Sequence, residues 1–315
     1  GTNWQKEVFK DAGITSHNLT ARGGGENMSY FFSAGYLGQD GIVGGGDKSN
    51  FNRLNLTANL SYDLTPKLKL IVNTSFVNLQ SQGVQENSFN SVIGSALNFD
   101  PTVAVNNTVP NTGGTFEYSN LLLSEIFNPL TKLENTYNES NGDKLYGKLE
   151  LQYSILKNLK LTTRYGYTKW DQVGKSFTPF VFYGPLNVEN TMNADGTPVT
   201  GKHNSVYEST FSAFNYTSET FANYNTNINE EHFFDVVAGF SFAESKGHGF
   251  NTNRQDVRDN SWAWADISAA TGENSIENIN AYTGASFQNL TRRNISYFGR
   301  LNYDYVDKYL ASFTL

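Results

Sequence analysis

Apolar and polar residues alternate one by one along many stretches of this chain. In residues 54–64 the even positions are Leu, Leu, Ala, Leu, Tyr and Leu, and the odd positions are Asn, Thr, Asn, Ser and Asp. The same alternation recurs at residues 145–153, 234–242 and 295–305. Because successive side chains of a β-strand point to opposite faces, this pattern predicts strands with one apolar face and one polar face.

The alternation and the turn residues between the runs predict an all-β chain. We expect ten strands, at residues 14–22, 28–38, 51–64, 67–79, 144–156, 158–170, 208–228, 232–245, 293–306 and 308–315. Several are longer than the usual soluble strand of about 5–6 residues. They reach the length of about 9–11 residues that a tilted strand needs to cross a bilayer.

Short and long connections alternate strictly between these strands. The short turns are residues 23–27, 65–66, 157–158, 229–231 and 307–308, and the long connections are residues 39–50, 80–143, 171–207 and 246–292. Antiparallel neighbours place all short turns at one end of the sheet and all long loops at the other. Outer-membrane barrels have this asymmetry, with short periplasmic turns and long extracellular loops. The predicted fold class is therefore an antiparallel transmembrane β-barrel segment.

A second group of residues supports a membrane setting, although a soluble alternative stays open. Aromatic residues gather near strand ends, as in an interfacial girdle; they are Tyr30, Tyr36, Tyr62, Phe76, Tyr153, Tyr167, Trp170, Tyr305 and Tyr309. A secreted β-sandwich or adhesin-type binding protein also alternates, with its apolar face turned inward. Strand length and loop asymmetry favour the barrel.

Composition narrows the function classes. Aromatic residues make up 14% of the 315 residues and charged residues only 17%, which disfavours a helical bundle or a Rossmann-type domain. The net charge of −7 argues against a nucleic-acid partner. With no cysteine, disulfides and thiolate chemistry are excluded. The sequence contains no apolar run of the roughly 18 residues that a membrane-spanning helix needs.

Five segments carry a family resemblance. Residues 2–9 (TNWQKEVF) resemble the segment TDWQDEIF of the SusC/RagA class of TonB-dependent outer-membrane transporters of Bacteroidetes. Residues 17–20 and 30–43 (YFFSAGYLGQDGIV) are similar to that family's HNLSVSGG…YYASLGYLDQEGIV. Residues 51–56 resemble its (Y/F)NxRxNL, and residues 296–305 (SYFGRLNYDY) its SYFGRVNYSY.

The resemblance implies a location and a task. Residues 1–315 would be a partial barrel domain, about ten strands of a barrel of about 22, with the plug domain and the remaining strands outside this chain. It would lie in the outer membrane of a Gram-negative bacterium and take up oligosaccharides or oligopeptides. The implied partners are a SusD-like surface lipoprotein, outer-membrane lipid, and the TonB–ExbB–ExbD motor acting through an N-terminal region absent here. No enzymatic activity and no resident cofactor are implied.

Two groups of side chains are candidates for contacts. Aromatic residues in the long loops would contact a ligand or a partner, or would instead pack loop against loop; they are Phe177, Phe180, Tyr183, Trp262 and Trp264. Polar residues on the inward face of the strands would face the lumen or the plug; they are Glu150, Arg164, Arg300 and Asn302. We expect the two arginines to have carboxylate partners.

Sites for phosphate, a metal ion or calcium are only weakly indicated. Residues 41–49 superficially resemble a phosphate-binding loop, but Asp47 interrupts the required Gly-Lys-Ser order. None of the four histidines has metal-ligand spacing. Asp256, Asp259 and Asp266 offer oxygen ligands for calcium in an outer loop, without the spacing of an EF-hand. Solvated loop carboxylates are the favoured interpretation.

Overall fold

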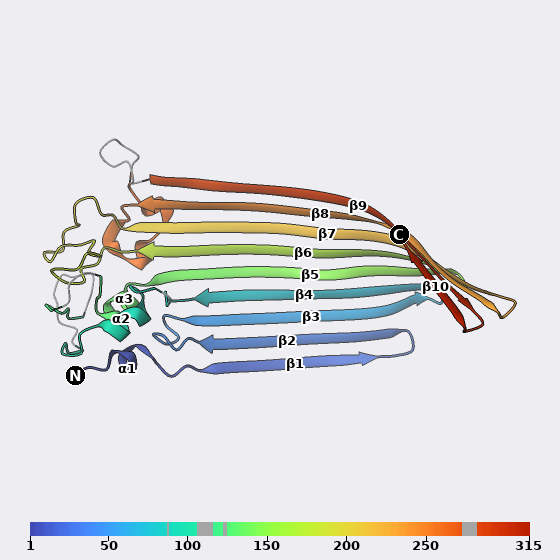
Figure 1. Cartoon of the computed structure of the whole chain (residues 1–315), viewed down its shortest axis with the longest axis horizontal. Coiled ribbons are helices and arrows are strands. Elements are labelled where there is room, and N and C mark those ends of the chain that lie inside the picture. The colour runs from blue at the N-terminus through green and yellow to red at the C-terminus, as the bar shows by residue number, and fades with distance from the viewer. Residues whose placement is uncertain (87, 106–115, 122–124, 273–281) are drawn as a thin grey trace.

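Ten strands form a single antiparallel sheet in which each strand pairs with the next in the chain (Figure 1). The structure, a computed structural model, describes residues 1–86, 88–105, 116–121, 125–272 and 282–315, with the backbone alone at 282–288. The strands are β1 (Ile14–Gly24), β2 (Met28–Asp40), β3 (Asn50–Thr65), β4 (Leu68–Gln82), β5 (Tyr137–Leu156), β6 (Leu159–Thr178), β7 (Ser205–Ile228), β8 (His232–Gln255), β9 (Tyr282–Tyr305) and β10 (Tyr309–Thr314).

All ten predicted strands are present, but several continue further toward the long loops than the sequence predicted. β5 begins at Tyr137 rather than at residue 144, β6 ends at Thr178 rather than at 170, and β8 ends at Gln255 rather than at 245. These extensions are mostly polar on both faces. Alternation shows a strand only where one face meets an apolar medium, so it does not detect strands that continue into water.

The register joins the apolar positions of neighbouring strands into continuous rows. One row crosses eight strands, through Tyr30, Leu60, Val72, Leu149, Tyr165, Ser218, Phe242 and Ile295. Nearly all of its members are apolar or aromatic. The residues between them in sequence, such as Ser61 and Glu150, lie on the opposite, polar face.

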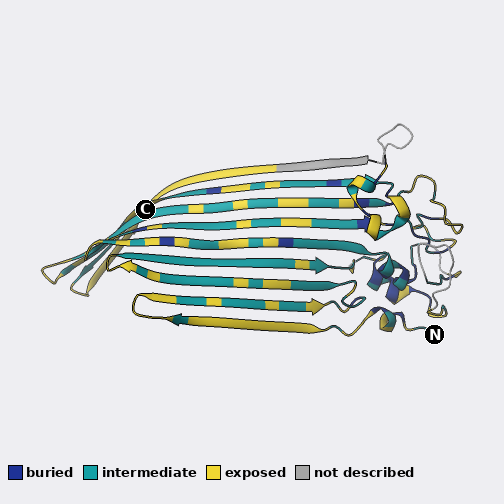
Figure 2. Ribbon diagram, turned by 180° about the vertical axis from the view of Figure 1, so that it is seen from behind, coloured by how far each residue is buried: buried dark blue, intermediate teal, exposed yellow. Residues whose placement is uncertain are grey.

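No second layer of the described chain covers the apolar face. Leu149 is 44% exposed and Tyr297 is 79% exposed. Buried side chains instead gather mainly at the loop end of the sheet (Figure 2). An apolar side chain left in water forgoes about 1.5–3 kcal/mol of burial free energy, so a whole face of them requires an apolar medium. The β-sandwich alternative is wrong, because a sandwich would bury these rows against a second sheet.

The two ends of the sheet differ as expected. Asn229 and Glu230 both have positive φ, as do Val306 and Asp307, which is the backbone of a tight hairpin turn. The opposite end carries the helices α1 (Trp4–Val8), α2 (Val92–Asn98) and α3 (Pro129–Glu134), and three short 3-10 turns, η1 (Arg258–Asn260), η2 (Trp262–Trp264) and η3 (Ile267–Ala269). Within the described residues, none of the helices has the length and apolar character needed to cross a membrane.

The assignment of faces predicts unequal effects of adjacent substitutions. Leu60→Arg is expected to lower the free energy of unfolding in a bilayer by about 2–4 kcal/mol, because it places a charge among lipid chains. Ser61→Arg, on the polar face, is expected to cost less than about 1 kcal/mol. Urea titration of the intact barrel in liposomes measures both values. Equal losses would contradict the assignment.

Candidate functional site: the polar face and the loop end of the sheet

Charged side chains on the polar face compensate one another. Glu150 accepts hydrogen bonds from Lys148 Nζ, at 2.8 Å, and from the side chain of Gln152. Arg164 lies opposite Glu150 in the register and donates to the carboxylate of Glu219 on the next strand. The four charges alternate in sign across β5, β6 and β7, so this part of the wall presents polar groups without a net charge.

A second pair lies across β8 and β9. Arg300 Nη2 is 3.3 Å from Asp235 Oδ2, and the amides of Asn302 and Asn223 also donate to this carboxylate, at 3.4 and 2.7 Å. Both nominated arginines therefore have the carboxylate partner that the sequence analysis expected. Glu150, Arg164, Arg300 and Asn302 all belong to such networks.

The loop between β8 and β9 packs against the strand ends around Trp262. The ring of Trp262 stacks on Tyr137, with centroids 5.8 Å apart, and Lys175 Nζ lies 4.7 Å from its centroid. Beside them a buried cluster is formed by Phe177, Val206, Val257, Ala265 and Ala270. The strand residues of this cluster share their face with the apolar rows. Phe177 and Trp262 therefore serve loop packing against the outer continuation of that face.

The loop between β6 and β7 is joined to its neighbours by another set of contacts. Tyr183 stacks on Phe127 at a centroid distance of 4.4 Å. Burial raises the pKa of the Tyr183 hydroxyl, with a smaller contribution from Glu189 in the same direction. The backbone N–H of Phe180 donates to Asn260 Oδ1 at 2.6 Å, and Asn260 Nδ2 donates to Phe180 O at 2.9 Å. The two hydrogen bonds with Asn260 fix the loop to η1, and the stack on Phe127 joins it to the loop between β4 and β5.

Trp264 differs from the other four nominated aromatic residues. Its side chain is 51% exposed, whereas Phe177, Phe180, Tyr183 and Trp262 are at least partly covered. The guanidinium carbon of Arg258 lies 5.8 Å from its ring centroid. Among the five, Trp264 is the residue whose ring is available to a ligand or a partner.

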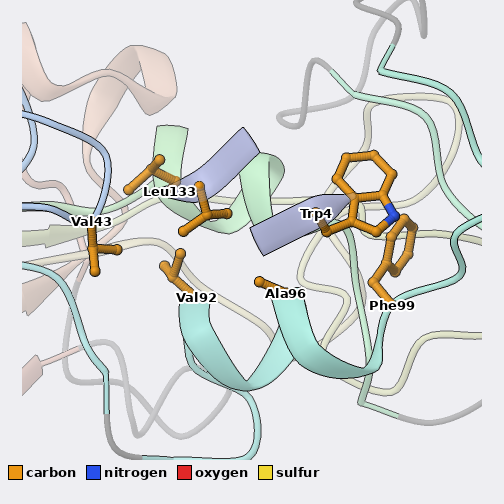
Figure 3. Close-up of a cluster of buried hydrophobic side chains, with 7 residues drawn as sticks. Trp4, Val43, Val92, Ala96, Phe99 and Leu133 are labelled. Atoms are coloured by element: carbon orange, nitrogen blue, oxygen red, sulfur yellow. The ribbon is translucent and has the colours of Figure 1, made fainter. Parts of the chain in front are cut away.

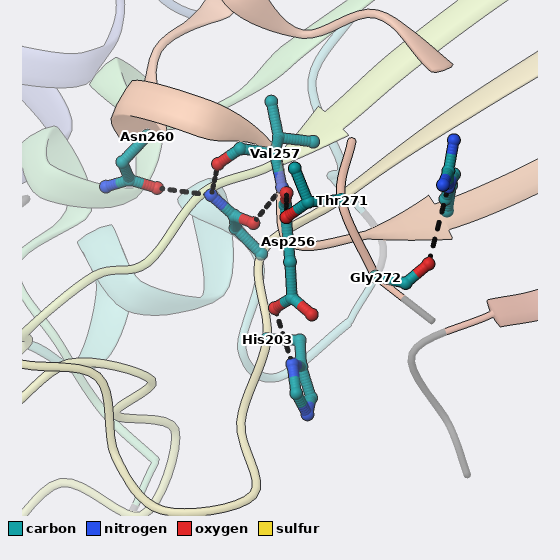
Figure 4. A network of polar contacts seen from close by, with 8 residues as sticks. His203, Asp256, Val257, Asn260, Thr271 and Gly272 are labelled. Atoms are coloured by element: carbon teal, nitrogen blue, oxygen red, sulfur yellow. Dashed lines mark hydrogen bonds and ion pairs between the residues drawn. The ribbon is translucent and has the colours of Figure 1, made fainter. Parts of the chain in front are cut away.

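A polar network anchors the β8–β9 loop (Figure 4). His203 Nδ1 is 2.7 Å from Asp256 Oδ1. The side chain of Asn204, which is 1% exposed, accepts from the N–H of Val257 at 2.8 Å and donates to its carbonyl at 2.9 Å. Thr271 N donates to Asp256 O at 2.9 Å. No local pattern in the sequence predicts this pairing of His203, because the two segments are distant in the chain.

The three nominated calcium ligands are directed to different partners. Asp256 faces His203, Asp259 lies 3.2 Å from Arg258 Nε, and Asp266 Oδ1 accepts the N–H of Ser268 at 2.7 Å. Over the described part of the chain, no three histidine, aspartate or glutamate side chains are grouped to hold a metal ion.

The three helices lie at the loop end beside β1 to β4 (Figure 1) and form a separate small core (Figure 3). Its buried members are Trp4, Val8, Val43, Val92, Ala96, Phe99 and Leu133. Trp4 packs edge-on against Phe99 at 5.1 Å and donates its indole N–H to Asp100 O at 2.9 Å. Sequence analysis missed these helices, although Ser91 caps α2, and Asn128 followed by a proline caps α3.

Comparisons with known proteins agree with this geometry. No family model matches the chain. It is 26% identical to the TonB-dependent receptor P3 of Formosa agariphila, over 99% of this chain and 29% of that protein. It is 26% identical to the TonB-dependent receptor SusC of Bacteroides thetaiotaomicron, over 100% of this chain and 30% of that protein.

A solved structure shows the same architecture. The structure of the RagAB peptide transporter superposes with a TM-score of 0.76 at 18% identity, covering 99% of this chain and 32% of that one. The resemblance to the SusC/RagA class is confirmed. The ten strands share the fold of part of the RagAB transporter structure. The chain spans less than a third of the length of the curated relatives named above.

The contrast between the two tryptophans predicts different effects of truncation. Trp262→Ala removes the stack on Tyr137 and is expected to raise the rate of protease cleavage within residues 256–272 by about tenfold or more, since losing a large, partly buried ring is expected to cost more than about 1 kcal/mol. Trp264→Ala is expected to leave the cleavage rate within about twofold. Limited proteolysis of intact cells measures this difference. Identical cleavage of both variants would contradict the packing role of Trp262.

The segment around Asp100 is expected to loosen in acid. Hydrogen bonds from Ser119 Oγ (2.6 Å) and from Thr102 Oγ1 and N (2.6 and 2.8 Å) hold the pKa of Asp100 below its ordinary value. The stabilisation is complete above the unfolded-state pKa of about 3.9 and is lost as pH falls through the lowered folded-state pKa.

Hydrogen exchange of residues 99–105, corrected for intrinsic rates, tests this pH dependence. Protection should fall below about pH 4 in the wild type. In Asp100→Asn the pH dependence should be absent. A wild-type profile that stays flat down to about pH 2 would contradict the assignment.

Proposed function

We propose that this chain forms part of the wall of an outer-membrane nutrient importer of the SusC type, driven by a TonB–ExbB–ExbD motor. The observation that carries the proposal is the pairing of an uncovered apolar face with a polar face whose charges compensate one another. Such a sheet suits a wall between lipid and a water-filled or plugged lumen. The names of the relatives point to the same kind of protein.

The orientation follows from the two ends of the sheet. The long loops with their packed cores would face outside the cell, and the hairpin turns would face the periplasm. No covalent chemistry is proposed, which accords with relatives that are named receptors and transporters. The plug domain and the other strands would be supplied by regions beyond this chain.

The loop end would meet the nutrient and a SusD-like surface lipoprotein. Trp264, with Arg258 beside it, is the nominated aromatic residue best placed for such a contact, because exposed aromatic rings anchor partners and stack on sugars. The cargo would be an oligosaccharide or an oligopeptide. A peptide is the cargo named for the RagAB transporter, a structural neighbour.

Growth assays test the proposal and separate the two cargo classes. Deletion of the gene for the intact protein should abolish growth on dilute oligomers of one class, glycan or peptide, while growth on the matching monomers stays normal. Complementation with Trp264→Ala should raise the oligomer concentration that supports half-maximal growth by at least about threefold, the effect of losing one exposed ring contact. Complementation with Leu186→Ala, which truncates another exposed loop side chain, should leave this oligomer concentration unchanged. Unchanged growth of the deletion strain on every oligomer would contradict import.

A further inference from the structure

Charged side chains occupy part of the face that should meet lipid. Glu244 and Lys246 follow Phe242 on β8 at alternate positions, and Arg293 pairs with Glu244 in the register. Phe242 and its partner Ile295 belong to the apolar row described above. Glu244, Lys246 and Arg293 therefore point away from the lumen, on the same side as the lipid-facing residues.

The three charges form a fixed arrangement. Lys246 Nζ lies 2.6 Å from Glu244 Oε1, and Arg293 Nε donates to the other carboxylate oxygen. The carboxylate side chain is only 6% exposed, whereas those of Lys246 and Arg293 are 54% and 61% exposed. The anion is covered and both cations face outward, so the surface that this group presents is positive.

A third cation extends the patch along the sheet. Lys169 on β6 pairs with Phe214, which pairs with Lys246, so the two lysines flank one aromatic ring on the same face. The Lys169 side chain is 52% exposed, and its Nζ lies 3.0 Å from Oδ2 of Asp171, whose side chain is 43% exposed on the same face. The basic patch is defined by Lys169, Lys246 and Arg293.

The patch lies at the outer limit of the apolar band. Glu244 is twelve positions along β8 from its first residue, His232, which at about 3.3 Å per residue and a tilt of about 40° corresponds to a height of roughly 30 Å. The apolar band of such barrels is about 25 Å tall. Aromatic rings lie in and just below the register row of Glu244 and Arg293, where the ring centroid of Tyr216, the partner of Glu244, is 5.4 Å from that of Tyr165 and 5.8 Å from that of Phe242. This sequence of layers is typical of a membrane interface.

We propose that the basic patch binds the phosphate of a phosphorylated lipid headgroup in the outer leaflet. The inference rests on the proposed outer-membrane location and orientation. Exposed cations at a lipid boundary attract anionic headgroups, and Arg and Lys held at fixed spacing suit phosphate oxygens. Glu244 is a positioning residue, because it holds Lys246 and Arg293 in place from beneath.

Lipid binding to the purified, delipidated intact transporter tests the proposal. The probe is bis-phosphorylated lipid A, and enzymatically dephosphorylated lipid A is the control. Native mass spectrometry measures the bound lipid. The combined variant K169Q/K246Q/R293Q should bind phosphorylated lipid A about a hundredfold more weakly than wild type, given the loss of three cations at about fivefold each. The control K67Q/K157Q/K308Q removes three lysines from the turns at the other end and should bind as wild type.

Lys246→Gln alone keeps the test decisive if the combined variant does not insert. It should weaken binding of phosphorylated lipid A by about fivefold and leave binding of the dephosphorylated lipid unchanged. Equal binding by the patch variants and wild type would overturn the proposal, as would equal binding of both lipids to wild type. A change in oligomeric state with unchanged lipid binding would also overturn it, in favour of contact with a second copy of the chain.

The outcomes separate this inference from the proposed function. A transporter that fractionates with the outer membrane and supports oligomer uptake, but does not distinguish the two lipids, refutes the patch alone. A protein absent from the outer-membrane fraction refutes both.

Discussion

The structure depends on the pairing of every strand backbone with its neighbours in a medium that offers no hydrogen bonds. In lipid an unpaired N–H or C=O costs several kcal/mol, so strands cross a membrane only as parts of a continuous ladder. Here ten strands pair in chain order, and the described residues contain neither a crossover nor a second layer. The side chains on one face of the sheet can then contact lipid, while those on the other face contact the lumen.

The loop end follows from the same constraint. Above the apolar band both faces of the strands meet water, so burial there needs partners other than lipid. The loops provide them in two small cores, one around Trp4 and Val92 and one around Phe177 and Val206. On the polar face the charges of Arg164 and Arg300 are compensated, since each arginine has a carboxylate partner from an adjacent strand.

Alternation in the sequence was sufficient to predict the strands, their order and the difference between the two ends, because each strand signals its two environments locally. It was insufficient where both environments are water, which is why β5, β6 and β8 proved longer than expected. Trp170, expected in the aromatic girdle, lies instead on the polar face opposite Lys144 and over Gly142. Its place at the end of the predicted strand, rather than its position in the alternation, suggested the girdle.

The loop residues were the least predictable part. The choice between ligand contact and loop packing depends on which segments meet in space, and nothing local to Trp262 indicated that Tyr137 would lie beneath it. The pairing of His203 with Asp256 was unpredictable for the same reason, since it joins segments that are distant in the chain. Trp264 keeps an exposed ring, and it alone of the nominated aromatic residues retains the open surface that a contact role requires.

Accessibility of single cysteines along β3 tests the central claim most directly, since this chain contains no cysteine of its own. Cysteines placed one at a time at residues 54–61 of the intact protein, in its native membrane, are reacted with a water-soluble maleimide and with a lipid-soluble one. The even positions are expected to react with the lipid-soluble reagent and the odd positions with the water-soluble one. Uniform reactivity with the water-soluble reagent would show that the apolar rows do not face lipid.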